Sequence, residues 1–513
     1  MKRITGLALG AAIALSALPM AATATMAQDV NIAFGATLDT LDPHNSTSNA
    51  VASIASGVMQ RLIGFDRDMN LVPMLAQSWE ANDAATEFTF KLRHGVMFHD
   101  GTDFNADAVK VNIGRLADQS LNLKRNSMMK VVKSIDVLDE YTVRITLNEP
   151  FGAMLATLAH PSIVMHSPKS LAENGMDVSK HPVGTGPFMF DSWIPGESYK
   201  VTGFSDYWDS EWPKVDSVTF LTVKEAATSV AMLRADEVQY VDTMPAELVE
   251  SVRADSKFFV EEIPGITVWT ASMNMMKPEF QDVRVRKAFN LAVDKNAFMH
   301  VVYSGHGRVP DSPIAPNTAF YSAQTPYTYD LDKARELMKE AGYENGFKIE
   351  AWARNSTAET RMLQFLQQQL SQINVDVEIF PLEPATRSQK VFGKDNKPEE
   401  MKHGLLIGGW SPSTGDADWH LRPVYATEGW IPKIYNMGFY SNPDVDAYIA
   451  AGLSSADDKV RGDAYAAAQA QIWDDAPVIW LATENKMAGR RSDLSGIFPM
   501  PDGTMSFANA AFE

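Results

Sequence analysis

The chain has 513 residues, contains no cysteine and carries a formal charge of −19. This acidic balance excludes a nucleic-acid binder and a protein held on an anionic membrane, because such affinity comes from clustered Lys and Arg. The lack of cysteine excludes disulfides, thiolate metal sites and a cysteine-linked lipid anchor, so large hydrophobic cores must hold the fold together.

The first 27 residues have the pattern of a secretory signal. Two basic residues, Lys2 and Arg3, precede an apolar stretch that ends near Met20, and small residues lead on to Ala27. This stretch is too short to span a bilayer, and no later stretch reaches the ~18 apolar residues that a membrane helix needs. We therefore expect an exported protein of the bacterial periplasm; an uncleaved N-terminal anchor is the alternative.

The remaining chain exceeds the ~250–300 residues at which a single core stops growing, so two or three domains are expected. In its first half the spacing of apolar residues alternates between period two and helical spacing, and 87–147 reads as a separate α+β unit. In chain order the predicted elements are a strand at 29–34, helical spacing at 51–62, a strand at 88–92, a helix capped by Asn105, a hairpin joining 135–137 to 143–147, a strand at 218–223 and a helix at 226–235.

After residue 271 the pattern indicates a compact α/β region. Strand, helix and strand follow one another, and a continuous apolar run at 405–407 is typical of a buried parallel strand. The predicted elements are helices capped by Asp282 and Asp330, a strand at 348–353, a helix at 358–373, and strands at 375–379 and 405–407. We therefore predict a parallel sheet in this part of the chain.

Ligands gather beyond the carboxyl ends of parallel strands, and two loops are expected at that edge. The first is "RNST" at 354–357, where Ser356 and Glu359 make a capping box that starts a helix. The partial positive charge of a helix N-terminus and the guanidinium fork of Arg354 both suit a carboxylate. A solvated surface position for Arg354 is the alternative.

The second loop, "GGWSPSTGDADWH" at 408–420, combines exposed backbone, aromatic faces and carboxylates. Its glycines allow close backbone approach, its tryptophans offer flat apolar walls, and its aspartates suit an ammonium group. Each residue also has an ordinary alternative, in a turn, a cap or core packing. The candidate ligand contacts are Gly409, Trp410, Ser411, Ser413, Asp416, Asp418 and Trp419 in this loop, with Arg125 and Arg387 as candidates for a second carboxylate.

No motif of a catalytic or cofactor-binding site stands out. The sequence has no G-x-S-x-G, no P-loop and no G-x-G-x-x-G. His94 and His99 flank a predicted turn without a third ligand, which argues against a metal site. Paired acids are too frequent in so acidic a chain to indicate a glycosidase. We therefore expect no catalysis, no metal and no cofactor; an exported peptide hydrolase is the alternative from another class.

Six stretches together resemble one family. They are "TLDPH" (40–44), "HDGTDFNADAVK" (99–110), "HPVGTGPF" (181–188), "VRVRKAFNLAVDK" (283–295), "KARELMKEAGY" (333–343) and the loop at 408–420. They are similar to extracellular solute-binding protein family 5, the periplasmic binding proteins of peptide and nickel ABC importers. The resemblance implies a periplasmic binding protein-like type II fold of class α/β, with two α/β lobes around a hinged cleft plus an extra α+β domain. It also implies delivery of a ligand to inner-membrane ABC permease subunits, without catalysis.

Further stretches resemble the glutathione-binding members of this family. They are "NLKRN" (122–126), "LAHPS" (158–162), "GWSPSTGDADW" (409–419), "FYSN" (439–442) and "MPDGTMSF" (500–507). In dipeptide relatives an aspartate three residues after the loop tryptophan grips the ligand amine, and here that position is Ser413. The departure fits a γ-glutamyl peptide, with Asp416 or Asp418 taking the amine. Arg354 resembles a carboxylate-binding arginine of dipeptide relatives.

On this likeness the chain divides into four parts. They are a signal peptide (1–27), lobe I (28–46 with 184–270 and 482–513), an extra α+β domain (47–183) and lobe II (271–481). We expect a monomeric receptor that captures a short, glutathione-like peptide by lobe closure. Arg354, with Arg125 or Arg387, is expected to hold the two carboxylates of this ligand. Other peptides, opines and nickel chelates are alternative ligands.

Overall fold

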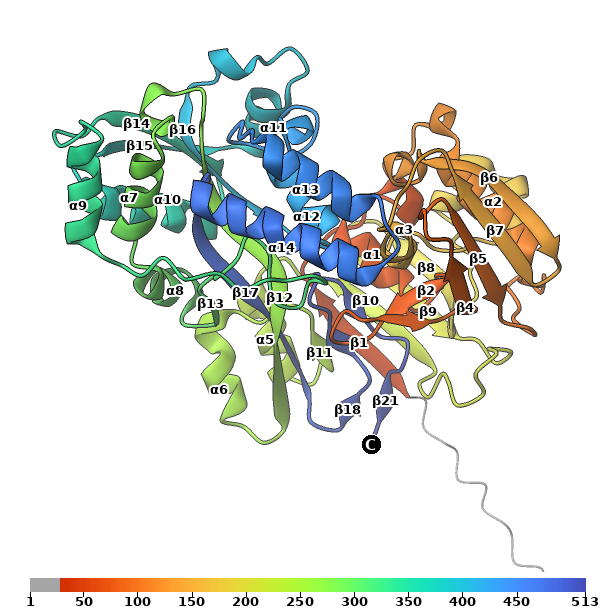
Figure 1. Ribbon diagram of the computed structural model, residues 1–513. Helices are drawn as coiled ribbons and strands as arrows, with labels where there is room; N and C mark the ends of the chain where they lie inside the picture. The colour runs from red at the N-terminus through yellow and green to blue at the C-terminus, as the bar shows by residue number, and fades with distance from the viewer. Residues whose placement is uncertain (1–27) are drawn as a thin grey trace, which may run out of the picture.

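The computed structural model describes residues 28–513, so the signal expected at 1–27 lies outside the described residues. No helix within 28–513 is long and apolar enough to cross a membrane. A sheet of eleven strands runs through the molecule, and a separate sheet of four strands belongs to a domain at the right of Figure 1.

One end of the large sheet, with the strand order β11-β1-β10-β9-β8, forms lobe I. The central strand β1 pairs in parallel with β10 and β11, whereas β10, β9 and β8 follow one another antiparallel. The elements of lobe I are β1 (Asp29–Phe34), α1 (Asn49–Ala55), β8 (Phe188–Ile194), β9 (Ser198–Gly203), β10 (Ser217–Thr222), α5 (Ala226–Arg234), β11 (Tyr240–Val241) and α6 (Val249–Arg253). The strand predicted at 29–34 is confirmed with the same bounds.

The core of lobe I draws on both ends of the chain. The rings of Phe188 and Phe220 lie 5.5 and 5.1 Å from the ring of Phe507, between ring centres. Helix α1 packs into the same core through Ile54, although the predicted division placed this helix in the extra domain. Short strands complete the C-terminal segment: β18 (Leu494–Ser495), β19 (Phe498–Pro499), β20 (Met505–Ser506) and β21 (Ala511–Phe512).

The extra domain is built on the antiparallel sheet β4-β5-β7-β6. Asn105 caps α2 as predicted, because its side chain accepts a hydrogen bond from the Ala108 amide at 3.2 Å. The predicted hairpin is observed as β6 and β7. The elements are β2 (Ile63–Phe65), β3 (Leu71–Pro73), β4 (Ala76–Ala81), β5 (Glu87–Leu92), α2 (Ala106–Ala117), β6 (Val132–Asp139), β7 (Thr142–Leu147), α3 (Met154–Ala159) and α4 (Pro168–Asn174).

The other end of the large sheet, with the order β15-β14-β16-β12, forms lobe II. The predicted parallel sheet is confirmed, since β14 pairs in parallel with both β15 and β16. Asp282 and Asp330 cap α7 and α9 as predicted. The elements are α7 (Val283–Ala292), α8 (Lys295–Tyr303), β13 (Gly307–Arg308), α9 (Leu331–Glu340), β14 (Lys348–Arg354), α10 (Thr357–Ser371), β15 (Asp376–Leu382), α11 (Pro384–Phe392), β16 (His403–Trp410), α12 (Asp418–Tyr425), α13 (Pro443–Leu453) and α14 (Asp458–Asp475).

Two long antiparallel strands, β12 (Phe258–Met273) and β17 (Val478–Arg491), pass through both lobes. The register of this pair shifts between Pro264 and Val268, so the ladder is interrupted where one lobe gives way to the other. The predicted domain boundaries at 270 and 482 fall inside these strands. Two lobes joined by such a hinge, with an extra α+β domain, match the fold class expected from the sequence.

Candidate functional site

The Arg354 loop (354–357) and the Trp410 loop (408–420) begin at the same edge of lobe II. The parallel neighbours β14 and β16 end at Arg354 and Trp410. On its other side Trp410 pairs with Val268 of β12, next to the register shift of the hinge. The structure therefore brings the two predicted loops together, at the side of lobe II that meets the hinge.

Arg354 has a fixed stem and a half-exposed guanidinium. Its backbone amide and its Nε donate to the two carboxylate oxygens of Glu359, at 2.9 and 2.6 Å. Ser356 caps α10 as predicted, but Glu359 reaches back to Arg354 rather than to Ser356. The Arg354 side chain is 47% exposed, and its guanidinium lies 5.9 Å from the ring centre of Trp269. Its outer nitrogens can therefore meet a ligand carboxylate.

The two glycines of the Trp410 loop meet side chains of the protein itself. A Cβ at Gly409 would lie 2.9 Å from the Trp269 ring, and one at Gly408 would lie 2.5 Å from Met437. The Gly409 carbonyl accepts a hydrogen bond from the Tyr435 hydroxyl at 3.3 Å. The close approach expected for a ligand is used here for internal packing, and a ligand contact at Gly409 stays a prediction.

Trp410 and Trp419 form a half-buried aromatic wall. The Trp410 indole N–H donates to the Trp419 carbonyl. The Trp410 ring lies 4.8 Å from the Tyr435 ring and 6.4 Å from the Trp419 ring, between ring centres. Trp419 also lines a crevice of about 560 Å³ between lobe II and the extra domain. The wall therefore has flat apolar faces that can pack on a ligand.

Ser411 connects the Trp410 loop to lobe I. Its hydroxyl donates to the carbonyl of Asp502 at 3.1 Å, while the Ser413 hydroxyl donates to the Ser411 carbonyl at 3.4 Å. Asp502 lies in the turn between β19 and β20, where the Gly503 amide donates to the Met500 carbonyl at 2.9 Å. The lobes are thus in direct contact at this loop, and Asp502 is a residue that the sequence interpretation missed.

Asp416 and Asp418 both pair with arginines of lobe II. Both carboxylate oxygens of Asp416 accept from Nη2 of Arg461 at 2.9 Å, and Asp418 accepts from Arg422 at 2.9 and 2.7 Å. The two aspartates are only 2% and 1% exposed. Burial raises the pKa of Asp416, and the charge of Arg461 opposes that rise. Arginines of lobe II already neutralise both carboxylates in this structure, which argues against a free acidic group here, and a contact of either residue with a ligand amine stays a prediction.

Arg387 of α11 is a buried cation. Its side chain is 9% exposed, and its Nε has no hydrogen-bond partner within residues 28–513. Its Nη2 lies 3.9 Å from the sulfur of Met437, and its guanidinium lies 5.4 Å from the ring centre of Phe392. A contact with a ligand carboxylate stays a prediction for this residue.

Arg125 lies beside two residues that the sequence interpretation did not connect with it, Arg61 and His160. The Arg61 guanidinium donates to the Ala159 carbonyl at 2.8 Å, while the Arg125 Nε is buried without a partner among the described residues. Burial lowers the pKa of both guanidiniums to about 10. Burial also holds the pKa of His160 well below its usual value, and the charges of Arg125 and Arg61 lower it further. The group lies in three separate sequence stretches, so no local spacing could reveal it.

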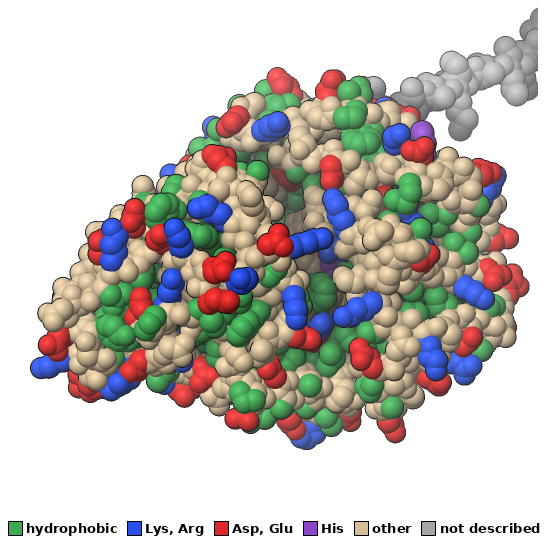
Figure 2. Space-filling view, turned by 90° about the horizontal axis from the view of Figure 1, so that it is seen from above, with side chains coloured by type: hydrophobic (Ala, Val, Ile, Leu, Met, Phe, Trp, Pro, Cys, Tyr) green, Lys and Arg blue, Asp and Glu red, His purple; other side chains and the backbone are tan. Residues whose placement is uncertain are grey.

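Two cavities adjoin the segment that carries Asp502. One, of about 380 Å³, is lined in part by Arg61 and Asp502, and the other, of about 370 Å³, lies at the hinge beside Asp242 and Tyr303. Figure 2 shows a hollow near the middle of the molecule with Lys and Arg side chains gathered round it. The site therefore offers cationic groups, carboxylates and aromatic faces within one interlobe region.

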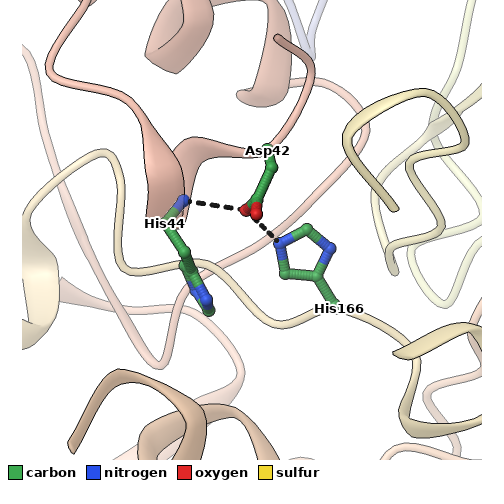
Figure 3. Close-up of side chains that lie close together, drawn as sticks. All are labelled: Asp42, His44 and His166. Atoms are coloured by element: carbon green, nitrogen blue, oxygen red, sulfur yellow. Dashed lines mark hydrogen bonds and ion pairs between the residues drawn. The ribbon is translucent and has the colours of Figure 1, made fainter. Parts of the chain in front are cut away.

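A buried cluster of Asp42, His44 and His166 has the composition of a metal site, with ligand atoms within 4.8 Å of one another. Figure 3 shows the His44 amide and the His166 ring both directed at the Asp42 carboxylate, at 3.0 and 3.3 Å. Arg115 occupies the cation position, because it donates to Asp42 at 2.7 Å and to Nδ1 of His44 at 2.9 Å. The cluster therefore works as a polar joint between lobe I and the extra domain.

The comparisons with known proteins cover nearly the whole chain. Residues 70–431 match the family model of bacterial extracellular solute-binding proteins, family 5 Middle. The chain is 39% identical to the glutathione-binding protein GsiB of Pectobacterium atrosepticum over 97% of each chain. It is 37% identical to GsiB of Escherichia coli strain K12, over 98% of this chain and 97% of that one.

Solved structures match the whole architecture. The periplasmic binding protein DppA of Helicobacter pylori, in complex with the peptide STSA, is 28% identical with a TM-score of 0.79, over 94% of this chain and 98% of that one. HbpA2 of Haemophilus parasuis is 24% identical with a TM-score of 0.82, over 94% of this chain and 100% of that one. The expected type II fold, with two lobes and an extra domain, is thereby confirmed.

Proposed function

Because the chain belongs to the bacterial extracellular solute-binding proteins of family 5, we propose that it is the periplasmic receptor of an ABC importer and that it captures glutathione. The observation that carries this proposal is the 37–39% identity with glutathione-binding proteins over almost the full length of both chains. In this proposal the receptor is monomeric, performs no catalysis and delivers the intact ligand to the permease subunits of the inner membrane.

The geometry of the cleft supports a ligand of mixed charge. Glutathione carries two carboxylates and one ammonium group at neutral pH, so it needs cationic groups at two points and an acidic group at one. Arg354 is our choice for one carboxylate, since its stem is fixed by Glu359 while its guanidinium is half exposed. Trp410 and Trp419 then provide the apolar wall beside the peptide. Ligand binding would stabilise the closed arrangement of the lobes, and the permease would recognise that form.

Calorimetric titration against glutathione, oxidised glutathione and dipeptides tests this function. We expect heat of binding with glutathione, and mass spectrometry of the recovered ligand should find it intact. Heat with dipeptides alone would move the ligand to other peptides, and opines or nickel chelates would be tried next. A cleaved ligand would show a peptide hydrolase instead of a receptor.

Replacing Arg354 with Ala is expected to weaken glutathione binding by about 1.5–3 kcal/mol, the usual contribution of a hydrogen bond to a charged group. The exposed Arg361 of the neighbouring helix α10 provides a control, because its replacement with Ala also removes one positive charge from this part of lobe II. Titration calorimetry of both variants should find the loss only for Arg354→Ala. Equal affinities in the two variants would remove Arg354 from the site.

A further inference from the structure

Arg61, Arg125, His160 and Asp502 form a group that we name the head pocket. Arg61 follows α1, Arg125 follows α2, His160 ends α3, and Asp502 comes from the C-terminal segment. The backbone amide of Arg125 donates to the carbonyl of His44 at 3.1 Å, which fixes this turn of the extra domain against lobe I. Four separate stretches of the chain thus contribute to this group.

The two guanidiniums of the head pocket touch no carboxylate of the described residues, and the charge of Asp502 acts on Arg61 only from a distance. Neither Arg61 nor Arg125 forms an ion pair with a carboxylate within residues 28–513, in contrast to Arg422 and Arg461 nearby in lobe II. A half-buried cation without an anion costs free energy. Charged groups left unpaired in this way are typical of binding sites, where the ligand supplies the opposite charge.

His160 provides a neutral hydrogen-bond donor beside the two guanidiniums. Its Nδ1 accepts a hydrogen bond from the Ser162 amide at 3.0 Å, so the neutral ring carries its proton on Nε2. The ring is 3% exposed, and burial lowers its pKa well below the usual value. The imidazole therefore adds no third positive charge to the two arginines and keeps one N–H donor.

Asp502 supplies the opposite charge at the edge of this pocket. It lines the same cavity of about 380 Å³ as Arg61, yet these two side chains do not form an ion pair in the described structure. One carboxylate oxygen of Asp502 accepts from the amide and the hydroxyl of Thr504, at 2.8 and 2.7 Å. Burial raises the pKa of Asp502, so an ammonium group placed beside it would stabilise its charged form.

We propose that the head pocket binds the α-amino-acid end of the ligand, with Arg61 and Arg125 on its α-carboxylate and Asp502 on its ammonium group. This inference rests on the proposed function and assigns the γ-glutamyl end of glutathione to the extra domain and lobe I. Arg354 is then assigned to the glycyl carboxylate. The acid beside it, Glu359, is already bound to Arg354 and is not free to hold the ammonium group, so this end of the site suits a carboxylate. The hydrogen bond from Ser411 to Asp502 links the head pocket to the Trp410 loop, so lobe closure completes both ends of the site.

Two shortened ligands test the assignment by calorimetry. The first, 4-aminobutanoyl-Cys-Gly, lacks the α-carboxylate, and the second, glutaryl-Cys-Gly, lacks the amine. Arg125→Gln should weaken glutathione binding by about 10- to 150-fold but leave the affinity for 4-aminobutanoyl-Cys-Gly unchanged. Asp502→Asn should weaken glutathione binding and leave the affinity for glutaryl-Cys-Gly unchanged. Lys133→Gln, at an exposed position of the extra domain, is the control for loss of a positive charge.

The outcomes separate this inference from the proposed function. A wild-type protein that binds no glutathione overturns the proposed function and the head pocket with it. If glutathione binds but Arg125→Gln weakens glutathione and 4-aminobutanoyl-Cys-Gly equally, Arg125 has only a structural effect and the assignment is overturned. Thermal unfolding of each variant, followed by circular dichroism, identifies a variant that fails to fold. Arg61→Gln then repeats the carboxylate test with the other guanidinium of the head pocket.

Discussion

Replacing Asp416 with Asn is expected to lower the free energy of unfolding by about 3–5 kcal/mol, the usual cost of removing one partner of a buried ion pair. The variant leaves the guanidinium of Arg461 buried without a carboxylate, and both side chains of this pair are almost inaccessible to water. Chemical denaturation followed by tryptophan fluorescence measures the loss. The same variant, once folded, should keep its affinity for glutathione because Asp416 faces Arg461 and not the ligand.

An exposed ion pair on α14, the helix that carries Arg461, provides the control. Lys459 and Asp463 of α14 lie 2.5 Å apart with side chains 83% and 71% exposed, so Asp463→Asn should cost less than about 1 kcal/mol. Combining Asp416→Leu with Arg461→Met should recover much of the lost stability, since the unpaired charge is then gone. Normal stability of Asp416→Asn together with a large loss of affinity would restore the role in ligand binding expected from the sequence.

Replacing Gly152 with Ala is expected to weaken ligand binding through the contact between the extra domain and lobe II, and not through a contact with the ligand itself. The Gly152 amide of the extra domain donates to the Leu453 carbonyl of lobe II at 2.7 Å. A Cβ at this position would collide with the carbonyl of Ser455 and lie 3.1 Å from Nε of Arg461. A cost of about 1–3 kcal/mol to the closed arrangement would lower the apparent affinity by about 5- to 150-fold.

Gly114 provides the matched control for this substitution. It lies in α2 of the same domain, and a Cβ there would only touch Ile135 at 4.0 Å. Gly114→Ala should therefore bind glutathione like the wild type, whereas Gly152→Ala should bind it less tightly at unchanged thermal stability. Equal affinity in both variants would show that contact between the extra domain and lobe II does not contribute to binding.

The elements that sequence reasoning predicted well are those with strong local signals. Asn105, Asp282, Asp330 and Ser356 each cap the helix expected of them, because a short polar side chain before an apolar periodic run satisfies the first free amides. The parallel strands of lobe II could be predicted for a similar reason. The continuous apolar run at 405–407 needs cover on both faces, which a parallel sheet under helices provides.

The two hinge strands were not predicted, for a physical reason visible in their composition. β12 contains Pro264 and Gly265 in its middle, a pair that indicates a turn, and the second half of β17 is rich in polar residues. Both features suit a strand that leaves one lobe and enters another. The local sequence pattern therefore indicates the break between the lobes. It gives no sign that each strand continues into the second lobe.

The sequence predicted part of the candidate site. The remaining part was missed because its residues pair with partners far away in the sequence. The carboxyl edge with Arg354 and Trp410 follows from the parallel order of β14 and β16. The spacing of Asp418 and Arg422 at i and i+4 could have revealed one ion pair of the loop. Arg461 lies 45 positions from Asp416, and no pattern in a single sequence connects them.

Closure of the lobes on glutathione is the central claim, and one distance measurement tests it most directly. The chain has no cysteine, so two can be introduced for maleimide dyes: Leu138→Cys on β6 of the extra domain and Tyr448→Cys on α13 of lobe II, both at exposed positions. Single-molecule energy transfer should find a longer, broader separation without ligand and a single shorter one with glutathione. The same separation in both conditions, at glutathione concentrations that saturate binding, would contradict the account.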